Sequence, residues 1–279
     1  MKIRLRMSPD ADDRFMVRAI VRREVDLRGL DFEIDHADTE RLNQAATEAD
    51  PPEVCAVSFG AWPAIADRYQ LLPHAGSYGD GYGPVLIVRA GGPLLADLHQ
   101  RPVAIPGRRT TAWRLVRQAL AEHGAEPTIV EIPITPPERT FDALRRGDVD
   151  AALIIHEGRL VFEALGFEQR LDIGAWWGAH QGLPLPLGAT AIRADLPGDV
   201  RAAVSGVLKA SIAHGLAHRA EAIAELVAMG GILGTPALMD RYLGMYANAR
   251  TLDPGEDGRA AVVRLMQVIG APPPVFAAD

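Results

Sequence analysis

Strand and helix signals alternate along this chain, and that alternation restricts the fold more than any other feature. Residues 2–7 alternate charged and apolar side chains, which is typical of a strand with one buried face, and an apolar-periodic helix follows them. Further strands are predicted at residues 30–34, 54–59 and 84–88, with turn residues and a second helix between them. This order of elements predicts an α/β fold with a mostly parallel sheet.

A second α/β unit follows the breaker cluster Ala-Gly-Gly-Pro at residues 90–93, and the chain is largely helical over residues 193–270. We therefore predict two lobes. The larger consists of residues 1–91 and 188–279, and the smaller, inserted lobe consists of residues 92–187. The chain would pass between the lobes twice in strand-like segments, which predicts a two-strand hinge with a cleft between the lobes.

The charge balance is acidic, with 29 basic and 36 acidic side chains and a formal net charge of −7 over 279 residues. This argues against nucleic acid as a partner, because nucleic-acid binding needs a basic surface. Neither the first residues nor any later stretch has the apolar length of a signal peptide or a membrane span. We therefore expect a cytoplasmic protein with no membrane partner. The one cysteine, Cys55, gives no basis for zinc or redox chemistry, which needs clusters.

A strand-like apolar run at residues 149–155 ends at His156, which is followed by Glu157 and a glycine. Ligands of open α/β sheets bind beyond the carboxyl ends of the strands, which is where this imidazole would lie. An unperturbed imidazole titrates near ~6.5, so His156 is a candidate general base. The alternative is a strand-end histidine bonded to a backbone partner, with Glu157 as a helix-start carboxylate.

Residues 105–113, Ile-Pro-Gly-Arg-Arg-Thr-Thr-Ala-Trp, place a turn, two guanidinium groups and two hydroxyls at a predicted helix start. Free N–H groups and the helix dipole favour an anion there, with Thr110, Thr111 and Arg108 as candidate ligands. A plain threonine cap beside solvated arginines explains the pattern equally well.

Three aspartates, Asp10, Asp12 and Asp13, lie together where the first helix is predicted to begin. Helix capping explains at least one of them, and nothing nearby supplies the further oxygen ligands that a hard cation needs. We therefore predict no metal site.

Four sequence motifs, taken together and in their order along the chain, resemble those of a known family. Residues 103–112 read Val-Ala-Ile-Pro-Gly-Arg-Arg-Thr-Thr-Ala, 153–159 read Leu-Ile-Ile-His-Glu-Gly-Arg, 172–177 read Asp-Ile-Gly-Ala-Trp-Trp, and 182–188 read Gly-Leu-Pro-Leu-Pro-Leu-Gly. Together with shorter matches at residues 40–43, 57–59 and 246–248, they resemble the dihydroxynaphthoate synthases of the futalosine route to menaquinone. The resemblance runs nearly from end to end.

The resemblance implies a two-lobed fold like that of type II periplasmic binding proteins. It also implies a carbon–carbon lyase that converts cyclic dehypoxanthinyl futalosine, a small-molecule aromatic carboxylate, to 1,4-dihydroxy-6-naphthoate without a metal or organic cofactor. His156 matches the family's proposed base. The resemblance implies substrate contacts from Asn43, Ser58 and Thr110 or Thr111. We add Asp13 and Arg108 as further candidate substrate-binding residues.

One segment departs from the family pattern. Many relatives carry Ser-x-Cys-Pro-Asn-Asp-Thr-Phe after the first strand, whereas residues 8–15 here read Ser-Pro-Asp-Ala-Asp-Asp-Arg-Phe. Asp13 and Phe15 keep their places, but Arg14 replaces a small hydroxyl residue, so the substrate contacts of this loop are open.

Two other functions fit the predicted fold, because fold alone does not fix function. A solute-binding protein for a transporter would bind a small carboxylate without catalysis, but export needs a signal or lipid anchor that the first residues do not show. The paralogous chorismate dehydratase of the same pathway is the other alternative. The His156 motif and the pair Trp176-Trp177 favour the naphthoate synthase.

Overall fold

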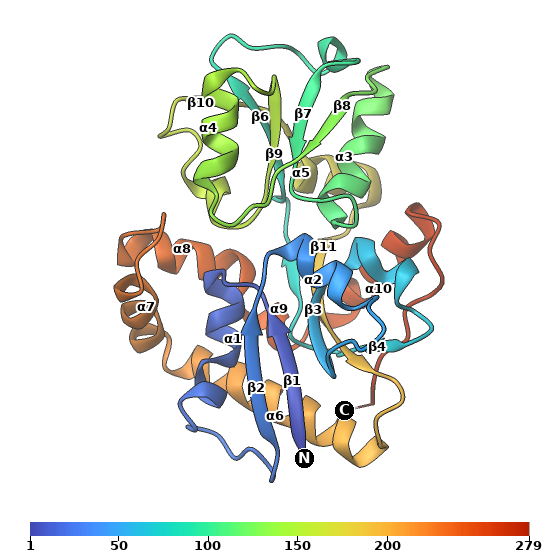
Figure 1. The fold of residues 1–279 in the computed structure, drawn as a ribbon, viewed down its shortest axis with the longest axis vertical. Coiled ribbons are helices and arrows are strands. Elements are labelled where there is room, and N and C mark those ends of the chain that lie inside the picture. The colour runs from blue at the N-terminus through green and yellow to red at the C-terminus, as the bar shows by residue number, and fades with distance from the viewer. Residues whose placement is uncertain (279) are drawn as a thin grey trace.

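The structure, a computed structural model that describes residues 1–278, has two lobes that are each built on a separate β-sheet (Figure 1). The first sheet has the strand order β2-β1-β3-β11-β4, and β5 also pairs with β11. Its strands are β1 (Lys2–Met7), β2 (Asp31–His36), β3 (Val54–Ser58), β4 (Tyr69–Leu71), β5 (Ser77–Gly79) and β11 (Leu185–Arg193). The second sheet has the order β10-β6-β9-β7-β8. Its strands are β6 (Val85–Arg89), β7 (Pro102–Ile105), β8 (Thr128–Glu131), β9 (Ala151–Ile154) and β10 (Phe167–Asp172).

Helices cover both faces of the first sheet. The apolar faces of α1 and α6 pack with Ile3 and Leu5 on one side, while α2 and α10 pack with Val57 and Ala191 on the other. The alternation of buried side chains along the strands produces these two faces. The helices and 3₁₀ turns of this lobe are α1 (Ala11–Val21), α2 (Thr39–Ala45), η1 (Phe59–Ala64), α6 (Gly198–Ala217), α7 (Arg219–Ala228), α8 (Pro236–Tyr246), α9 (Ala249–Leu252) and α10 (Gly255–Val268).

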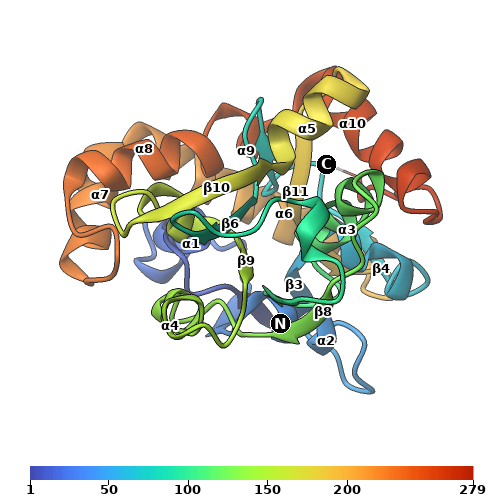
Figure 2. The ribbon, with the colours of Figure 1, turned by 90° about the horizontal axis from the view of Figure 1, so that it is seen from above.

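The second sheet is sandwiched in the same way, as the view from above makes clear (Figure 2). Phe141 and Leu144 of α4 pack on the face that carries Ile87 and Ala152, and α3 and α5 cover the opposite face. The helices and 3₁₀ turns here are η2 (Ala96–Leu98), α3 (Thr111–Glu122), α4 (Glu138–Arg146), η3 (His156–Leu160) and α5 (Ile173–Gln181).

The prediction of a mostly parallel sheet is wrong for both lobes, which contain mixed sheets. β1 pairs in parallel with β2 and β3, and β7 with β8 and β9, but β11 and β6 run antiparallel to all of their neighbours. The reason is topological. Each of these two strands enters its sheet from the other lobe, on the side that faces the cleft. The parallel strands end on that side, so the entering strand runs in the opposite direction.

The prediction that residues 84–88 form the fourth strand of the first sheet is also wrong, because β6 pairs with β9 and β10 in the second sheet. The passage from the first lobe therefore precedes residue 85, and the return passage precedes β11. We propose lobe boundaries near residues 83 and 184 in place of 91 and 188. A strand that is buried on both faces is a continuous apolar run in either sheet, so the sequence could not show which sheet contains residues 84–88.

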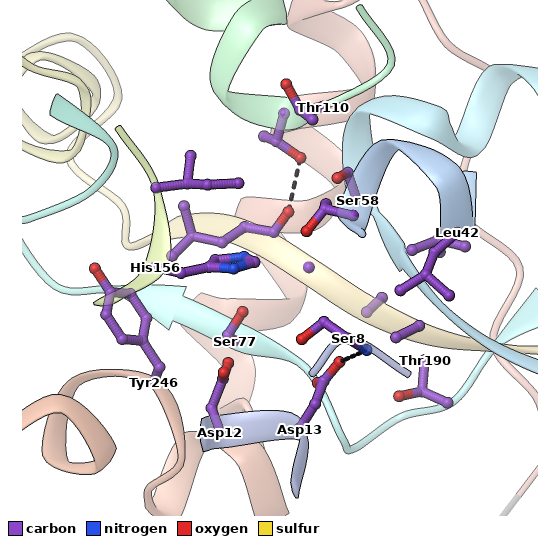
Figure 3. Close-up of a pocket in the computed structure, with 18 of the residues that line it drawn as sticks. Ser8, Asp12, Asp13, Leu42, Ser58, Ser77, Thr110, His156, Thr190 and Tyr246 are labelled. Atoms are coloured by element: carbon purple, nitrogen blue, oxygen red, sulfur yellow. Dashed lines mark hydrogen bonds between the residues drawn. The ribbon is translucent and has the colours of Figure 1, made fainter. Parts of the chain in front are cut away.

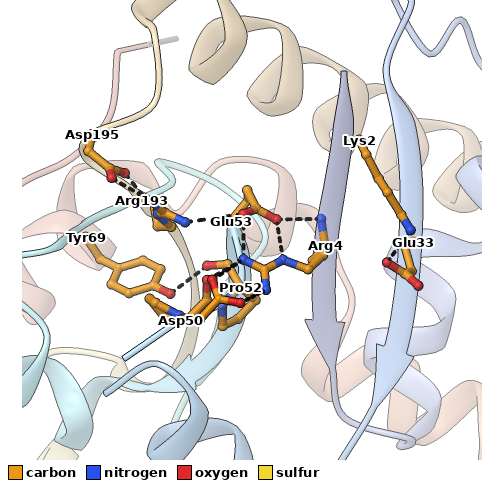
Figure 4. Close-up of polar contacts among 10 residues, drawn as sticks. Lys2, Arg4, Glu33, Asp50, Pro52, Glu53, Tyr69, Arg193 and Asp195 are labelled. Carbon is orange, nitrogen blue, oxygen red and sulfur yellow. Dashed lines mark hydrogen bonds and ion pairs between the residues drawn. The ribbon is translucent and has the colours of Figure 1, made fainter. Parts of the chain in front are cut away.

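An ion-pair network ties the strands of the first sheet together far from the cleft (Figure 4). Glu53 accepts hydrogen bonds from the backbone N–H of Arg4 at 2.9 Å and from its guanidinium at 2.8 and 2.9 Å, and it also contacts Arg193 at 3.3 Å. The network joins β1 to the start of β3 and to the end of β11. None of the helices within residues 1–278 combines the length and the apolar character needed to cross a membrane.

Candidate active site

A pocket lies between the lobes at the carboxyl ends of the parallel strands (Figure 3). It encloses about 740 Å³ of space, including its opening to solvent. Ser8 follows β1, Ser58 ends β3, and His156 follows β9, so three strand ends deliver polar side chains to one place. The first lobe adds Asp12 and Asp13 of α1, and the second lobe adds the start of α3.

His156 occupies an unusual backbone conformation at the end of the apolar run. Its φ is +53°, in the left-handed region that residues other than glycine rarely adopt. Strain of this kind persists only where the surrounding structure imposes it, and it concentrates at functional sites. His156 lines the pocket, as predicted for a histidine at the end of a strand, and about a quarter of its side chain is exposed.

The imidazole is held by a carboxylate from the other lobe. Nδ1 of His156 lies 2.5 Å from Oδ2 of Asp10, whose side chain is 10% exposed. Burial alone would lower the pKa of His156, but the charge and hydrogen bonding of Asp10 and the charges of Asp12 and Asp13 raise this pKa to about 10. Burial alone would raise the pKa of Asp10, but the charge of His156 and hydrogen bonds from His156 and Ser8 lower it. The pair is therefore an imidazolium and a carboxylate at neutral pH.

The other carboxylates around this pair each have a defined donor. Asp12 accepts from the hydroxyl of Tyr242 at 2.8 Å, and Asp13 accepts from the backbone N–H of Ser8 at 2.6 Å. Burial and the neighbouring charge of Asp12 raise the pKa of Asp13 to about 7. Burial and the charge of Asp10 likewise raise the pKa of Glu157 to about 7. Two acidic groups in this cluster, Asp13 and Glu157, therefore titrate near neutral pH.

Asp10 and Glu157 both interact with groups of the opposite lobe. Asp10 stands at the N-cap position of α1, yet its side chain makes no capping hydrogen bond. The first N–H group of that helix, on Ala11, instead donates to Glu157 of the other lobe at 3.1 Å. Among the three aspartates for which capping was predicted to explain at least one, Asp10 is not a side-chain cap, because its carboxylate contacts His156 instead. Within residues 1–278 no group of three or more His, Cys, Asp or Glu side chains is arranged to hold a metal ion.

Ser58 presents a hydroxyl donor to the pocket. Its Oγ accepts from Nδ2 of Asn43 at 3.2 Å, and its backbone N–H donates to Oδ1 of the same asparagine at 2.8 Å. The O–H of Ser58 has no acceptor of its own among the described residues, so it is free to donate to a ligand. Asn43 is fully buried and does not line the pocket, so the structure places it behind Ser58.

The two threonines at the start of α3 line the pocket, but their hydroxyls are already used. Thr110 caps α3, accepting from the N–H of Trp113 at 3.2 Å and donating to Gly107 at 2.8 Å. The Thr111 hydroxyl donates to the carbonyl of Leu187 at 2.7 Å and accepts from Gly60 at 3.0 Å. The remaining donors at this helix start are backbone N–H groups in the first turn.

Glycine at position 60 is required for this arrangement, because a Cβ there would lie 2.8 Å from backbone atoms of residues 109–111.

Arg108 lies outside the pocket, contrary to its predicted place. Its side chain is 57% exposed and pairs with Glu131 at 2.7 Å on the outer surface of the second lobe. The next residue, Arg109, pairs with Glu40 across the cleft at 3.2 Å. Neighbouring residues of a turn point in different directions, so the pattern Arg-Arg-Thr-Thr could not say which guanidinium faced the site.

The pocket also contains residues that are not among the predicted site residues. Ser77 of β5 and Tyr246 of α8 both line it. β5 is three residues long, too short for a strand signal, and Tyr246 lies about 90 residues beyond His156 in the chain. For Asp10 the sequence suggests a helix cap or a cation ligand and gives no sign of the contact with His156.

Comparison with known proteins agrees with this geometry. Residues 3–271 match the family model described as menaquinone biosynthesis. The chain belongs to this family. Among the members of the menaquinone biosynthesis family, a 1,4-dihydroxy-6-naphthoate synthase of Thermus thermophilus is 37% identical to it over 94% of this chain and 92% of that protein. A synthase of the same name from Streptomyces coelicolor is 32% identical over 95% of this chain and 91% of that protein.

Solved structures show the same fold. A protein of Archaeoglobus fulgidus superposes with a TM-score of 0.86 at 34% identity, covering 96% of this chain and 97% of that one. The periplasmic aliphatic sulphonate binding protein of Escherichia coli superposes with a TM-score of 0.64 at 16% identity, covering 96% of this chain and 86% of its own. The predicted two-lobed, periplasmic-binding-protein-like fold is therefore confirmed.

Proposed function

We propose that this protein is a 1,4-dihydroxy-6-naphthoate synthase, a carbon–carbon lyase that converts cyclic dehypoxanthinyl futalosine to 1,4-dihydroxy-6-naphthoate. One observation carries the proposal: a chain similar along nearly its whole length to two such synthases directs an imidazole, in a strained conformation, into a pocket between its lobes. A strained, partly buried titratable group in a cleft is typical of a catalytic site.

The substrate's aromatic carboxylate would bind where the donors converge. The first turn of α3 offers backbone N–H groups and the positive end of a helix dipole, and Ser58 offers its free hydroxyl. The pocket wall around Leu42, Val57 and Leu187 is apolar and suits an aromatic ring.

His156 would act as the base that removes a proton from the reacting carbon of the substrate. An imidazole whose pKa is about 10 is protonated in all but about 1 in 1,000 molecules at pH 7, so it must lose this proton before it can act as a base. In its neutral form it would be a stronger base than an ordinary imidazole, which favours abstraction of a weakly acidic C–H proton. A base role thus predicts a rate that increases with pH.

Product analysis tests the function directly. Purified protein is incubated separately with cyclic dehypoxanthinyl futalosine and with chorismate, and the products are identified by mass spectrometry. We expect 1,4-dihydroxy-6-naphthoate from the first and no reaction of the second. Binding without turnover would instead indicate a solute-binding protein, and dehydration of chorismate would indicate the paralogous dehydratase. Either result would refute the proposal.

A further inference from the structure

We infer that Asp10 is a positioning residue that holds the imidazole of His156 through Nδ1 and leaves Nε2 to the substrate. The inference rests on the proposed function for its catalytic meaning. Its structural basis is the 2.5 Å contact between Oδ2 of Asp10 and Nδ1 of His156. Within residues 1–278 neither atom makes a hydrogen bond of good geometry with any group, so a close ion pair is what joins the two side chains.

The local structure of α1 supports a dedicated role for this carboxylate. An aspartate at an N-cap position normally accepts from the backbone N–H groups of the first turn, which stabilises the helix. Asp10 occupies that position with extended backbone angles but makes no such bond. Its backbone N–H donates to Oγ of Ser8 at 3.2 Å, which fixes the loop that carries it. The side chain thus forgoes a local interaction and contacts a residue 146 positions away.

The orientation has a chemical consequence. An imidazole has two nitrogens, and the group bonded to one of them decides which proton the ring carries and where the other nitrogen points. With Nδ1 directed at Asp10, the lone pair or proton available to a ligand is on Nε2. The left-handed backbone of His156 sets where its side chain leaves the main chain, and the contact with Asp10 then sets the direction of the ring.

The groups that face this pair come from several elements. Asp12 and Asp13 approach from α1, Glu157 from η3, and Tyr242 from α8, where it is bonded to Asp12. Arg14 acts on Asp10 from within α1. Among them Asp10 makes the one direct contact with the ring, so its removal should move the titration of His156 most.

Two measurements on the full chain test the inference. In the first, the ring nitrogens of His156 are titrated by NMR, with the signal assigned by its loss in His156→Asn. We expect wild-type protein to show a proton on Nδ1 and a pKa near 10, and Asp10→Asn to lower this pKa by two or more pH units toward ~6.5. A matched control, Asp50→Asn, removes a carboxylate that pairs with Arg4 outside the pocket and should leave it unchanged.

The second measurement is the pH dependence of kcat/KM. In Asp10→Asn the rising limb should move to lower pH together with the pKa of His156. The plateau of kcat should fall by about 10²-fold because the ring is no longer held, with a much smaller change in KM. Asp10→Glu should recover part of both. If Asp10→Asn does not fold, Asp10→Cys serves as the second variant, because cysteine is the residue of the family pattern at this place.

The outcomes separate the two proposals. If the chain has no synthase activity, the proposed function fails while the NMR titration still decides whether Asp10 holds His156. An unchanged pKa of His156 in folded Asp10→Asn, or an unchanged pH profile in an active variant, would overturn the inference. A loss of stability with no change in either readout would likewise reduce Asp10 to a structural residue.

Discussion

Replacing Ser58 by alanine should weaken binding of the substrate's carboxylate while leaving the pocket intact. The Ser58 hydroxyl is the donor in this region that no protein group uses, and the hydroxyls of Thr110 and Thr111 are occupied by Gly107 and Leu187. A hydrogen bond to a charged acceptor contributes about 1.5–3 kcal/mol. Its loss corresponds to an affinity lower by about 10- to 150-fold, since 1.4 kcal/mol is a factor of ten.

Calorimetry with a benzoate-bearing substrate analogue and its neutral amide measures this effect. Ser58→Ala should reduce affinity for the acid far more than affinity for the amide. Its cost in stability should be about 1 kcal/mol, because Nδ2 of Asn43 keeps Glu40 as an acceptor. Ser211→Ala is the matched control: it removes a buried hydroxyl that donates to Met16 at 2.7 Å, and it should change neither affinity. If Ser58→Ala preferred the acid as strongly as the parent does, the hydroxyl would not recognise the carboxylate.

Four further results are expected. His156→Asn should fold and bind the substrate but lose about 10²- to 10⁴-fold in kcat, and near-parental turnover would remove this imidazole from the reaction. In wild-type protein kcat/KM should rise through neutral pH toward about pH 10, because the raised pKa keeps His156 protonated below it; a flat profile that falls only above pH 10 would make the imidazolium an acid. Turnover should survive exhaustive chelation, and loss with EDTA that one added metal restores would count against a metal-free reaction. Glu53→Gln should lower the free energy of unfolding by about 2 kcal/mol in thermal or denaturant melts, since Arg4 loses a partly buried partner; burial opposes but bonding to Arg4 lowers the pKa of Glu53, so this contribution is present above about pH 4.5 and disappears as pH falls through the lower folded-state pKa.

Local patterns in the sequence predicted the elements better than their pairing. The start of α3 at Thr110 and the apolar run before His156 were identified because a cap and a buried strand are short-range features. The direction of β6 and β11 depends on which lobe each strand comes from, which is long-range information. Strands of three residues such as β4 and β5 carry too few side chains for any periodicity.

The sequence singled out several residues that line one pocket, but not how those residues contact one another. His156, Ser58, Asp13 and the two threonines all line one pocket. Asn43, by contrast, supports Ser58 from behind. The pairing of Asp10 with His156 joins residues from two sheets, and only the folded chain brings them within contact distance. An aspartate before a helix has a local explanation as a cap, and this explanation conceals a tertiary partner.

Because Asp10 follows a strand of one sheet and His156 follows a strand of the other, any opening of the cleft separates the ion pair. An imidazole exposed to water would return toward its ordinary pKa near ~6.5, so between that pH and about 10 the closed form holds one more proton than the open form. Proton uptake and closure are then thermodynamically linked. In this range each unit of increasing pH should shift the balance between open and closed molecules by up to about 1.4 kcal/mol toward the open form. The acidity of the medium would thus act on the residence time of bound molecules as well as on the chemical step.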